Sequence, residues 1–253
     1  MSAAAIDFSI VWPAFVAGLL VIATHVPLGV QVLSRGIVFI DLAVAQIAGL
    51  GVVLGDWLGF EPQGGAVQIA ALAAALAGAL LLNWTERRWP EVQEAVIGVT
   101  FILAANAAIL LLAANPHGSE HLKDLLVGQI LWVSPGRLAL AALVYAVLLW
   151  VWFGLAERIG RVGFYVVFAC AVTLSVQLVG LYLVFTSLIV PALATRFFVR
   201  WRLAASYLLG ALGYAAGLAL SMVSDLPAGP LIVCTLSALG IGLFALGPGR
   251  APV

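Results

Sequence analysis

The stretch RGIVFIDLAVAQIAGLGVVLG, residues 35–55, decides the fold of this chain. It is apolar enough to cross a bilayer, and Ala45 with Gly49 forms a small-xxx-small pair, a pattern typical of close helix packing in membranes. We therefore expect this helix to pack inside a bundle. The same stretch carries Asp41 and Gln46. A carboxylate at membrane depth is costly, so Asp41 is either a functional group or a structural carboxylate that reaches the interface or a basic neighbour.

The composition of the whole chain predicts a polytopic membrane protein. Of its 253 residues, 64% are hydrophobic and only 9% are charged, and the mean hydropathy is +1.19. Soluble domains are about 45–50% apolar and about 25% charged. The formal net charge of zero argues against a nucleic-acid partner, because phosphate binding needs a basic patch.

Apolar runs of spanning length divide the chain into a series of predicted membrane helices. A hydrocarbon core of about 30 Å needs roughly 20 apolar residues. By this measure the spans fall near residues 9–30, 37–55, 66–83, 94–114, 136–155, 163–195, 203–222 and 229–247. The run at 163–195 is too long for one ordinary crossing, and Gly180 lies in its middle. We expect two short helices there, or one span with a re-entrant piece.

Arginine residues predict the orientation, because cytoplasmic loops retain positive charge. We assume that the loop that holds Arg35 faces the cytoplasm, and that successive loops then alternate between the two sides of the membrane. On this assumption the arginines named next all face the cytoplasm only when the run at 163–195 counts as two crossings. These arginines are Arg87, Arg88, Arg158, Arg161, Arg196, Arg200, Arg202 and Arg250. The opposite loops carry five acidic residues and two basic ones: Asp56, Glu61, Glu120, Asp124, Asp225, Lys123 and Arg137. We therefore expect about nine crossings, with the N-terminus outside.

One external loop matches the letters of a zinc-protease motif. The run from His117 through Glu120 to His121 reads H-x-x-E-H, which needs both histidines on one face of a helix. Pro116 and Gly118 favour a turn here and argue against a protease. The remaining alternatives are a solvated loop, which we favour, and an external metal-handling loop with His117, Glu120 and His121 as ligands.

Three polar residues within the spans are candidates for a substrate pathway: Asp41, Gln46 and Gln177. Asp41 and Gln46 are five residues apart, so they point roughly 140° away from each other and are not expected to ligate one ion together. Gln177 either bonds across helices or lines a passage. Since the sequence contains no P-loop, the energy for any transport must come from an ion gradient or from another chain.

Six motifs in series resemble the permease subunit of zinc, manganese and iron ABC importers, the ABC-3 type membrane subunit. The motifs begin with VPLG at 26–29 and the small-residue helix at 37–55, and the others follow in the family's order. They are EAVIG at 94–98, LLVGQILWVS at 125–134, SVQLVG at 175–180 leading into LIVPALA at 188–194, and DLPAG at 225–229. The resemblance covers almost the whole chain.

The resemblance implies an all-helical type II importer permease of about eight to nine transmembrane helices, forming a single domain at 1–253 in the inner (cytoplasmic) membrane. It implies that two membrane subunits, identical in the simplest case, sit among lipid on two ATP-binding subunits. An extracytoplasmic protein delivers the metal. This chain would then carry no cofactor and no enzymatic activity of its own, with ATP bound by the partner. The coupling element would lie at 154–162, with Glu157, Arg158 and Arg161, in a form shorter than the family usually shows.

This sequence departs from the family pattern in the second helix. The family commonly reads Gly-Asp-x-x-x-His-x-x-x-x-Gly there, and placing Gly51 on the final glycine puts Gln46 at the histidine and Leu42 at the aspartate, with Asp41 one residue early. A neutral amide is a weak ligand for transition metals. The ion therefore passes with few protein ligands, or this branch carries a chelated or non-metal substrate. An ion-coupled secondary transporter and an intramembrane enzyme are the rival classes.

Overall fold

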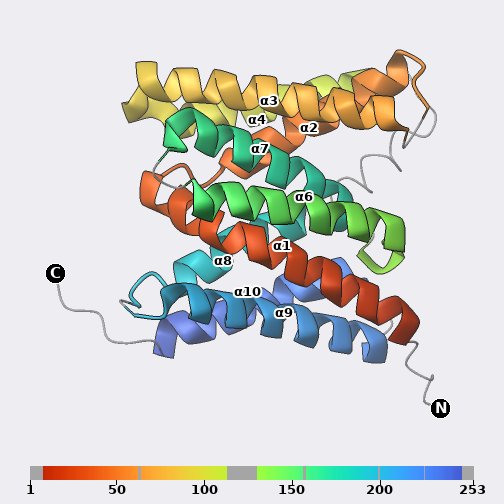
Figure 1. Cartoon of the computed structure of the whole chain (residues 1–253), viewed down its shortest axis with the longest axis vertical. Helices are drawn as coiled ribbons and strands as arrows, with labels where there is room; N and C mark the ends of the chain where they lie inside the picture. The colour runs from red at the N-terminus through yellow and green to blue at the C-terminus, as the bar shows by residue number, and fades with distance from the viewer. Residues whose placement is uncertain are drawn as a thin grey trace.

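The computed structural model describes residues 8–61, 64–112, 130–155, 158–198, 200–224 and 226–246, and within these residues all regular structure is helical (Figure 1). The helices are α1 (Phe8–Arg35), α2 (Ile40–Trp57), α3 (Gly65–Arg88), α4 (Gln93–Leu112), α6 (Pro135–Gly154), α7 (Gly160–Val179), α8 (Leu181–Ala194), α9 (Arg202–Ser224) and α10 (Ala228–Leu246). Two short 3₁₀ turns, η1 (Pro90–Val92) and η2 (Ile130–Trp132), precede α4 and α6. The predicted all-α polytopic fold is confirmed.

The predicted break in the long run at 163–195 occurs at Gly180. This residue has φ 86° and ψ 159°, a combination that essentially only glycine adopts, and it separates α7 from α8. Within the described residues, eight helices are long and apolar enough to span a membrane, and α8 is a shorter apolar helix of 14 residues. Consecutive helices alternate in direction through all of them (Figure 1). The structure therefore agrees with two passes at 163–195.

Two of the arginines that were predicted to be cytoplasmic, Arg35 and Arg161, lie at one end of the bundle, and Arg250 lies outside the described residues. Arg35, at the end of α1, stacks 4.2 Å from the centre of the Phe164 ring at the start of α7. Arg161 forms an ion pair with Glu86 near the end of α3, with 3.8 Å between its Nε and the carboxylate. These contacts tie α1, α3 and α7 together where the arginine-bearing turns meet. We take this end as the cytoplasmic one, following the charge rule.

One side of the bundle packs α1, α8, α9 and α10 closely through small residues. Gly217 in α9 lies so near α10 that a Cβ atom there would meet the Ile232 Cα at 2.4 Å. Tyr214 places its ring against Gly18 of α1, and its hydroxyl lies 2.9 Å from the Ser187 Oγ of α8. Helix backbones can approach this closely only where side chains are absent or small.

On the other side α2 packs against α3 and α4, which lie together at the top of Figure 1. Gly51 faces the α3 backbone, where a Cβ atom would meet the Ala70 carbonyl oxygen at 2.8 Å. The predicted packing pair, Ala45 and Gly49, does not make this contact. Both residues line a groove between α2, α4, α7 and α8 instead. The expectation of a buried, closely packed helix holds, but a different set of small residues makes the contact.

Candidate translocation site

A groove runs along α2 on the side away from α3, and Gln46 is the only polar side chain among the described residues that line it. Its other lining residues are apolar and come from four helices: Ala45, Gly49, Val53, Ala108, Leu112, Val176 and Leu181. Gln46 is half-buried and makes no side-chain hydrogen bond within the described part of the chain. The groove thus offers a passing solute one free amide between apolar walls.

Asp41 lies deeper than Gln46 and nearer to the cytoplasmic end of α2. It is fully buried, and neither carboxylate oxygen has a hydrogen-bond partner among the described residues. Because it precedes Ala45 by four residues, it lies within about 40° of that groove-lining position around the helix axis. The structural interpretation of Asp41, in which it reaches the interface or a basic neighbour, is not what the structure shows.

Glu94 is a polar residue beside the start of α2 that was not among the residues predicted to line a pathway. It begins α4, and its Oε1 accepts a hydrogen bond of 3.2 Å from the backbone N–H of Phe39, just before α2. Its Oε2 is buried and has no hydrogen-bond partner in the described structure. The signal that pointed to it was available, since EAVIG at 94–98 was one of the recognised motifs. Its hydrogen-bond partner, the Phe39 N–H just before α2, could not be predicted from the sequence.

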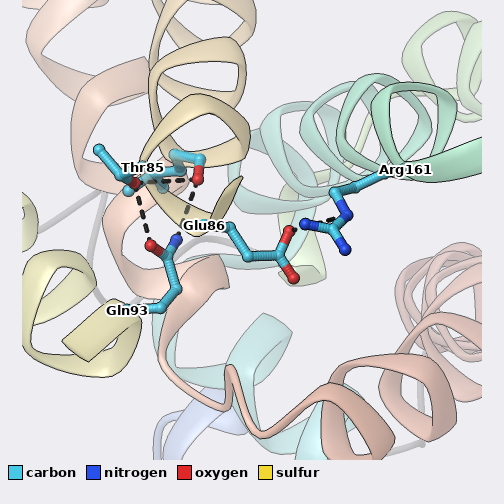
Figure 2. A network of polar contacts seen from close by, with 5 residues as sticks. Thr85, Glu86, Gln93 and Arg161 are labelled. Carbon is cyan, nitrogen blue, oxygen red and sulfur yellow. Dashed lines mark hydrogen bonds and ion pairs between the residues drawn. The ribbon is translucent and has the colours of Figure 1, made fainter. Parts of the chain in front are cut away.

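The residue before Glu94 is anchored to α3 by a small polar network (Figure 2). The Gln93 Nε2 donates to the Leu82 carbonyl at 3.0 Å, and the Gln93 Oε1 accepts from the Thr85 hydroxyl at 3.0 Å. Beside it, Figure 2 shows Glu86 reaching toward Arg161 of α7. Gln93 and Thr85 are buried, so this network fixes the start of α4 against the end of α3.

The predicted coupling residues fall at the turn between α6 and α7. Arg161 is half-exposed and engages Glu86, whose side chain is 14% exposed. Arg158 is exposed and lies in the turn, with its backbone N–H 2.8 Å from the Leu155 carbonyl oxygen. Glu157 lies outside the described residues. Arg158 is therefore exposed at the arginine-bearing end of the bundle, while Arg161 also holds α7 to α3.

The third predicted pathway residue is displaced from the groove. Gln177 is half-buried on α7, and its neighbour Val176 lines the groove in its place. Successive helical residues point about 100° apart, so the two side chains face different surroundings. The predicted residue Gln177 thus lies next to a side chain that lines the groove, and its pathway role stays a prediction.

Some other buried polar groups are held by hydrogen bonds within the bundle. The His25 Nδ1 lies 2.9 Å from the Val21 carbonyl oxygen and 3.0 Å from the Thr24 hydroxyl, as expected for a hydrogen-bonded packing residue. Tyr145 of α6 bonds to Ser175 of α7 across 2.5 Å. The weak metal prediction at His117, Glu120 and His121 lies outside the described residues. Within the described residues no three His, Cys, Asp or Glu side chains form a metal-binding group.

The bundle of apolar helices around a groove with a free amide defines a multi-pass membrane protein of the transport type. A family model described as the ABC 3 transport family matches residues 7–158 and 152–246. The chain belongs to this family, whose members are membrane permeases of ABC transporters. The resemblance drawn from the six sequence motifs is thereby confirmed.

Individual relatives agree with this assignment. The chain is 24% identical to the high-affinity zinc uptake system membrane protein ZnuB of Haemophilus influenzae, over 94% of this chain and 98% of that protein. It is 28% identical to an uncharacterized membrane protein of Synechocystis sp., over 92% of this chain and 89% of the relative.

Two solved structures share the fold. PsaBC from Streptococcus pneumoniae in complex with Fab matches with a TM-score of 0.76 and 22% identity, over 96% of this chain and 93% of that chain. A protein described as a metal-chelate type ABC transporter, in an inward-facing conformation, matches with a TM-score of 0.66 and 16% identity, over 97% and 91% of the two chains.

Proposed function

We propose that this chain is the membrane-spanning permease subunit of an ABC importer that translocates a divalent metal ion: zinc, manganese or iron. The observation that carries the proposal is the groove beside α2, which places the one polar lining side chain, Gln46, on the helix that also holds the buried Asp41. Membership of the ABC 3 transport family and the relative named as a zinc uptake membrane protein support a metal substrate.

The proposal assigns each step to a part of the molecule. A metal ion delivered by an extracytoplasmic binding protein enters between α2, α4, α7 and α8, and it passes Gln46 before it meets Asp41. The apolar walls and the single amide bind the ion weakly, which suits passage rather than storage. Energy comes from ATP on a separate subunit, since the sequence has no P-loop.

The assembly that follows from this proposal contains two permease subunits in the inner membrane, identical in the simplest case. Two ATP-binding subunits attach to them. The exposed Arg158 and the half-exposed Arg161 lie at the arginine-rich end of the bundle, where an ATPase partner would dock. With Glu157 they form the proposed coupling surface.

The test is uptake into proteoliposomes that contain this chain with its co-purified partners. We expect zinc, manganese or iron to accumulate only when ATP is hydrolysed, and Gln46→Ala to change the rate or the order of preference. Gln68→Ala is the matched control, because Gln68 is an exposed glutamine on α3. Uptake that persists without ATP but collapses with an ion gradient would instead identify a secondary transporter and refute the proposal.

A second candidate, a permease for a chelated metal, is favoured by the amide at position 46. Gln46 is a poor ligand for a bare transition metal but a good hydrogen-bond partner for an organic chelator. The structural neighbour described as a metal-chelate type transporter has the same fold. Comparing uptake of free metal with uptake of the same metal bound to a small chelator decides between the two substrates.

A further inference from the structure

A second groove, separate from the one beside α2, lies between α1, α6 and α7. Leu28 of α1 and Ala171 of α7 line it with buried side chains, whereas Leu148 and Trp152 of α6 line it with half-buried ones. Its open side therefore lies along α6, which runs beside α1 and α7 (Figure 1). Only 17% of the α6 span is buried inside the chain. The groove thus opens on a surface that meets lipid.

The walls of this groove are apolar. Thr24 carries the only hydroxyl among the described residues that line it. That hydroxyl donates to the Val21 carbonyl at 3.1 Å and lies 3.0 Å from the His25 Nδ1. A polar solute would lose its hydration here without gaining a hydrogen bond. A hydrocarbon chain has no such cost and gains van der Waals contact with the walls.

A guanidinium without an anionic partner lies at the cytoplasmic end of the groove. Arg35 follows Leu28 by seven residues on α1, so it lies about 10.5 Å nearer to the cytoplasm and within about 20° of the same helix face. Its guanidinium stacks 4.2 Å from the centre of the Phe164 ring, which lies 6.1 Å from the ring of the groove-lining Trp152. Within the part of the chain that the structure describes, the Arg35 side chain forms no ion pair and no hydrogen bond.

The stacked arginine is suited to bind a phosphate. Stacking on a ring fixes the plane of a guanidinium and leaves the N–H groups at its edge free, and their fork matches the oxygens of a phosphate. Arg35 is half-buried, so this edge can be reached. Trp152 lies two residues before the end of α6, at the level where tryptophan meets lipid headgroups. The groove and Arg35 therefore match the acyl chain and the headgroup of a lipid in the cytoplasmic leaflet.

We propose that the groove between α1, α6 and α7 binds one anionic phospholipid, with an acyl chain along Leu28 and its phosphate on Arg35. This site goes beyond the proposed function and uses none of the residues assigned to the passage of the metal ion. The net negative charge of the lipid matters, because a zwitterionic headgroup offsets its phosphate with a cation. The bound lipid completes the packing of α6, in which Ala141 and Tyr145 are the only buried residues described.

The test is native mass spectrometry of the purified full-length chain in detergent, titrated with phosphatidylglycerol or with phosphatidylcholine of the same acyl chains. We expect one phosphatidylglycerol to bind more tightly than phosphatidylcholine. Arg35→Gln should weaken phosphatidylglycerol binding by about fivefold and leave phosphatidylcholine binding unchanged. Arg88→Gln is the matched control, because Arg88 is an exposed arginine in the last turn of α3. Arg35→Lys, which keeps the charge without the planar fork, should fall between the wild type and Arg35→Gln.

A second pair of variants tests the place of the acyl chain. Leu148→Trp fills the groove and should weaken the binding of both lipids. Leu143→Trp is its control, since Leu143 is 65% exposed on the same helix, and it should leave both affinities unchanged. Inorganic phosphate should not displace the lipid, because it has no chain to occupy the groove.

Several outcomes would overturn the inference. Equal affinity for the two lipids would reduce the contact to ordinary boundary lipid, and equal losses from Arg35→Gln and Arg88→Gln would reduce it to diffuse surface charge. Lipid that binds single chains and is lost from pairs of chains would show that a second copy covers the groove. Circular dichroism identifies variants that fail to fold. If Arg35→Gln is one of them, Arg35→Lys and the two tryptophan variants decide.

Discussion

Buried side-chain oxygens are paired differently on the two sides of the bundle, although two buried nitrogens on the first side, His25 Nε2 and Arg202 Nε, also lack a partner within the described structure. Where α1, α8, α9 and α10 meet, hydroxyls are paired: Ser187 lies 2.9 Å from Tyr214, Thr195 lies 2.7 Å from Ser206, and Thr235 donates to the Gly213 carbonyl oxygen. Around the inner parts of α2, α3, α4 and α7, several buried oxygens lack a hydrogen-bond partner within the described structure: Asp41, Asn83, Glu94 and Thr173.

We interpret this difference as a division between a part of the molecule that is packed for stability and a part that would serve the proposed transport. Paired hydroxyls and closely approaching backbones stabilise one arrangement and tolerate little change. Unsatisfied oxygens cost stability, and they persist where a ligand or water completes them. Stability and transport should therefore respond to substitutions on different sides of the bundle.

The largest effect is expected from Asp41→Asn. Removal of a buried charge that lacks a cation should leave thermal stability unchanged or raised, whereas metal uptake by the assembled transporter should fall by about tenfold or more. Thermal unfolding and uptake are measured on the same preparation. A variant that loses stability in proportion to uptake would show that Asp41 serves the fold.

On the packed side, Gly217→Ala should destabilise the protein by about 1–3 kcal/mol, because the new methyl group would overlap the α10 backbone at Ile232. Gly242→Ala is its control, since a Cβ atom there has no described atom within 4 Å and the substitution should stabilise the helix slightly. Chemical denaturation in detergent compares the two. Equal effects would show that the approach of α9 to α10 is looser than described.

Matched hydroxyl deletions sharpen the comparison. Ser187→Ala removes the partner of the buried Tyr214 hydroxyl and should cost about 1–3 kcal/mol. Thr173→Val, which keeps the side-chain shape and removes a buried Oγ without a described partner, should be neutral or stabilising. Unfolding midpoints measure both. If Thr173→Val proved the more harmful of the two, the division between the sides would be wrong.

The smallest stability effect is expected at the cytoplasmic end. The ion pair of Arg161 with Glu86 is half-exposed, so Arg161→Gln should change the free energy of unfolding by less than about 1 kcal/mol. Stimulation of the partner's ATPase activity by substrate should nevertheless fall, if this turn couples the subunits. Arg137→Gln, on the opposite end of α6, is the comparison for ATPase stimulation.

Much of the fold could be predicted because each element is encoded locally. Span lengths and the distribution of arginines depend on the membrane, and the break at Gly180 depends on the backbone of that residue alone. None of these features requires knowing which helix packs against which. The direction of a side chain around a helix is a different matter. Ala45 and Gly51 are both small, and only the placement of α3 decides that Gly51 packs while Ala45 lines a groove.

The candidate site could be predicted only in part for the same reason. Asp41 and Gln46 were visible as polar residues in an apolar span, but Glu94 looked like an ordinary first-turn carboxylate near a helix start. Its hydrogen bond to the Phe39 N–H follows from the pairing of α2 with α4, which no pattern within either helix specifies. Gln177 was selected by polarity alone, and the neighbouring Val176 lines the groove.

Because α8 is short, the thickness of the lipid bilayer should affect how the helices of this protein are arranged. Its 14 residues cover about 21 Å, whereas a typical hydrocarbon core is about 30 Å thick, so the helix alone is about 9 Å short. Mismatch of this kind is relieved by thinning the surrounding lipid or by tilting and regrouping helices. Because Leu181, at the start of α8, lines the groove, acyl-chain length should change the shape of this groove directly.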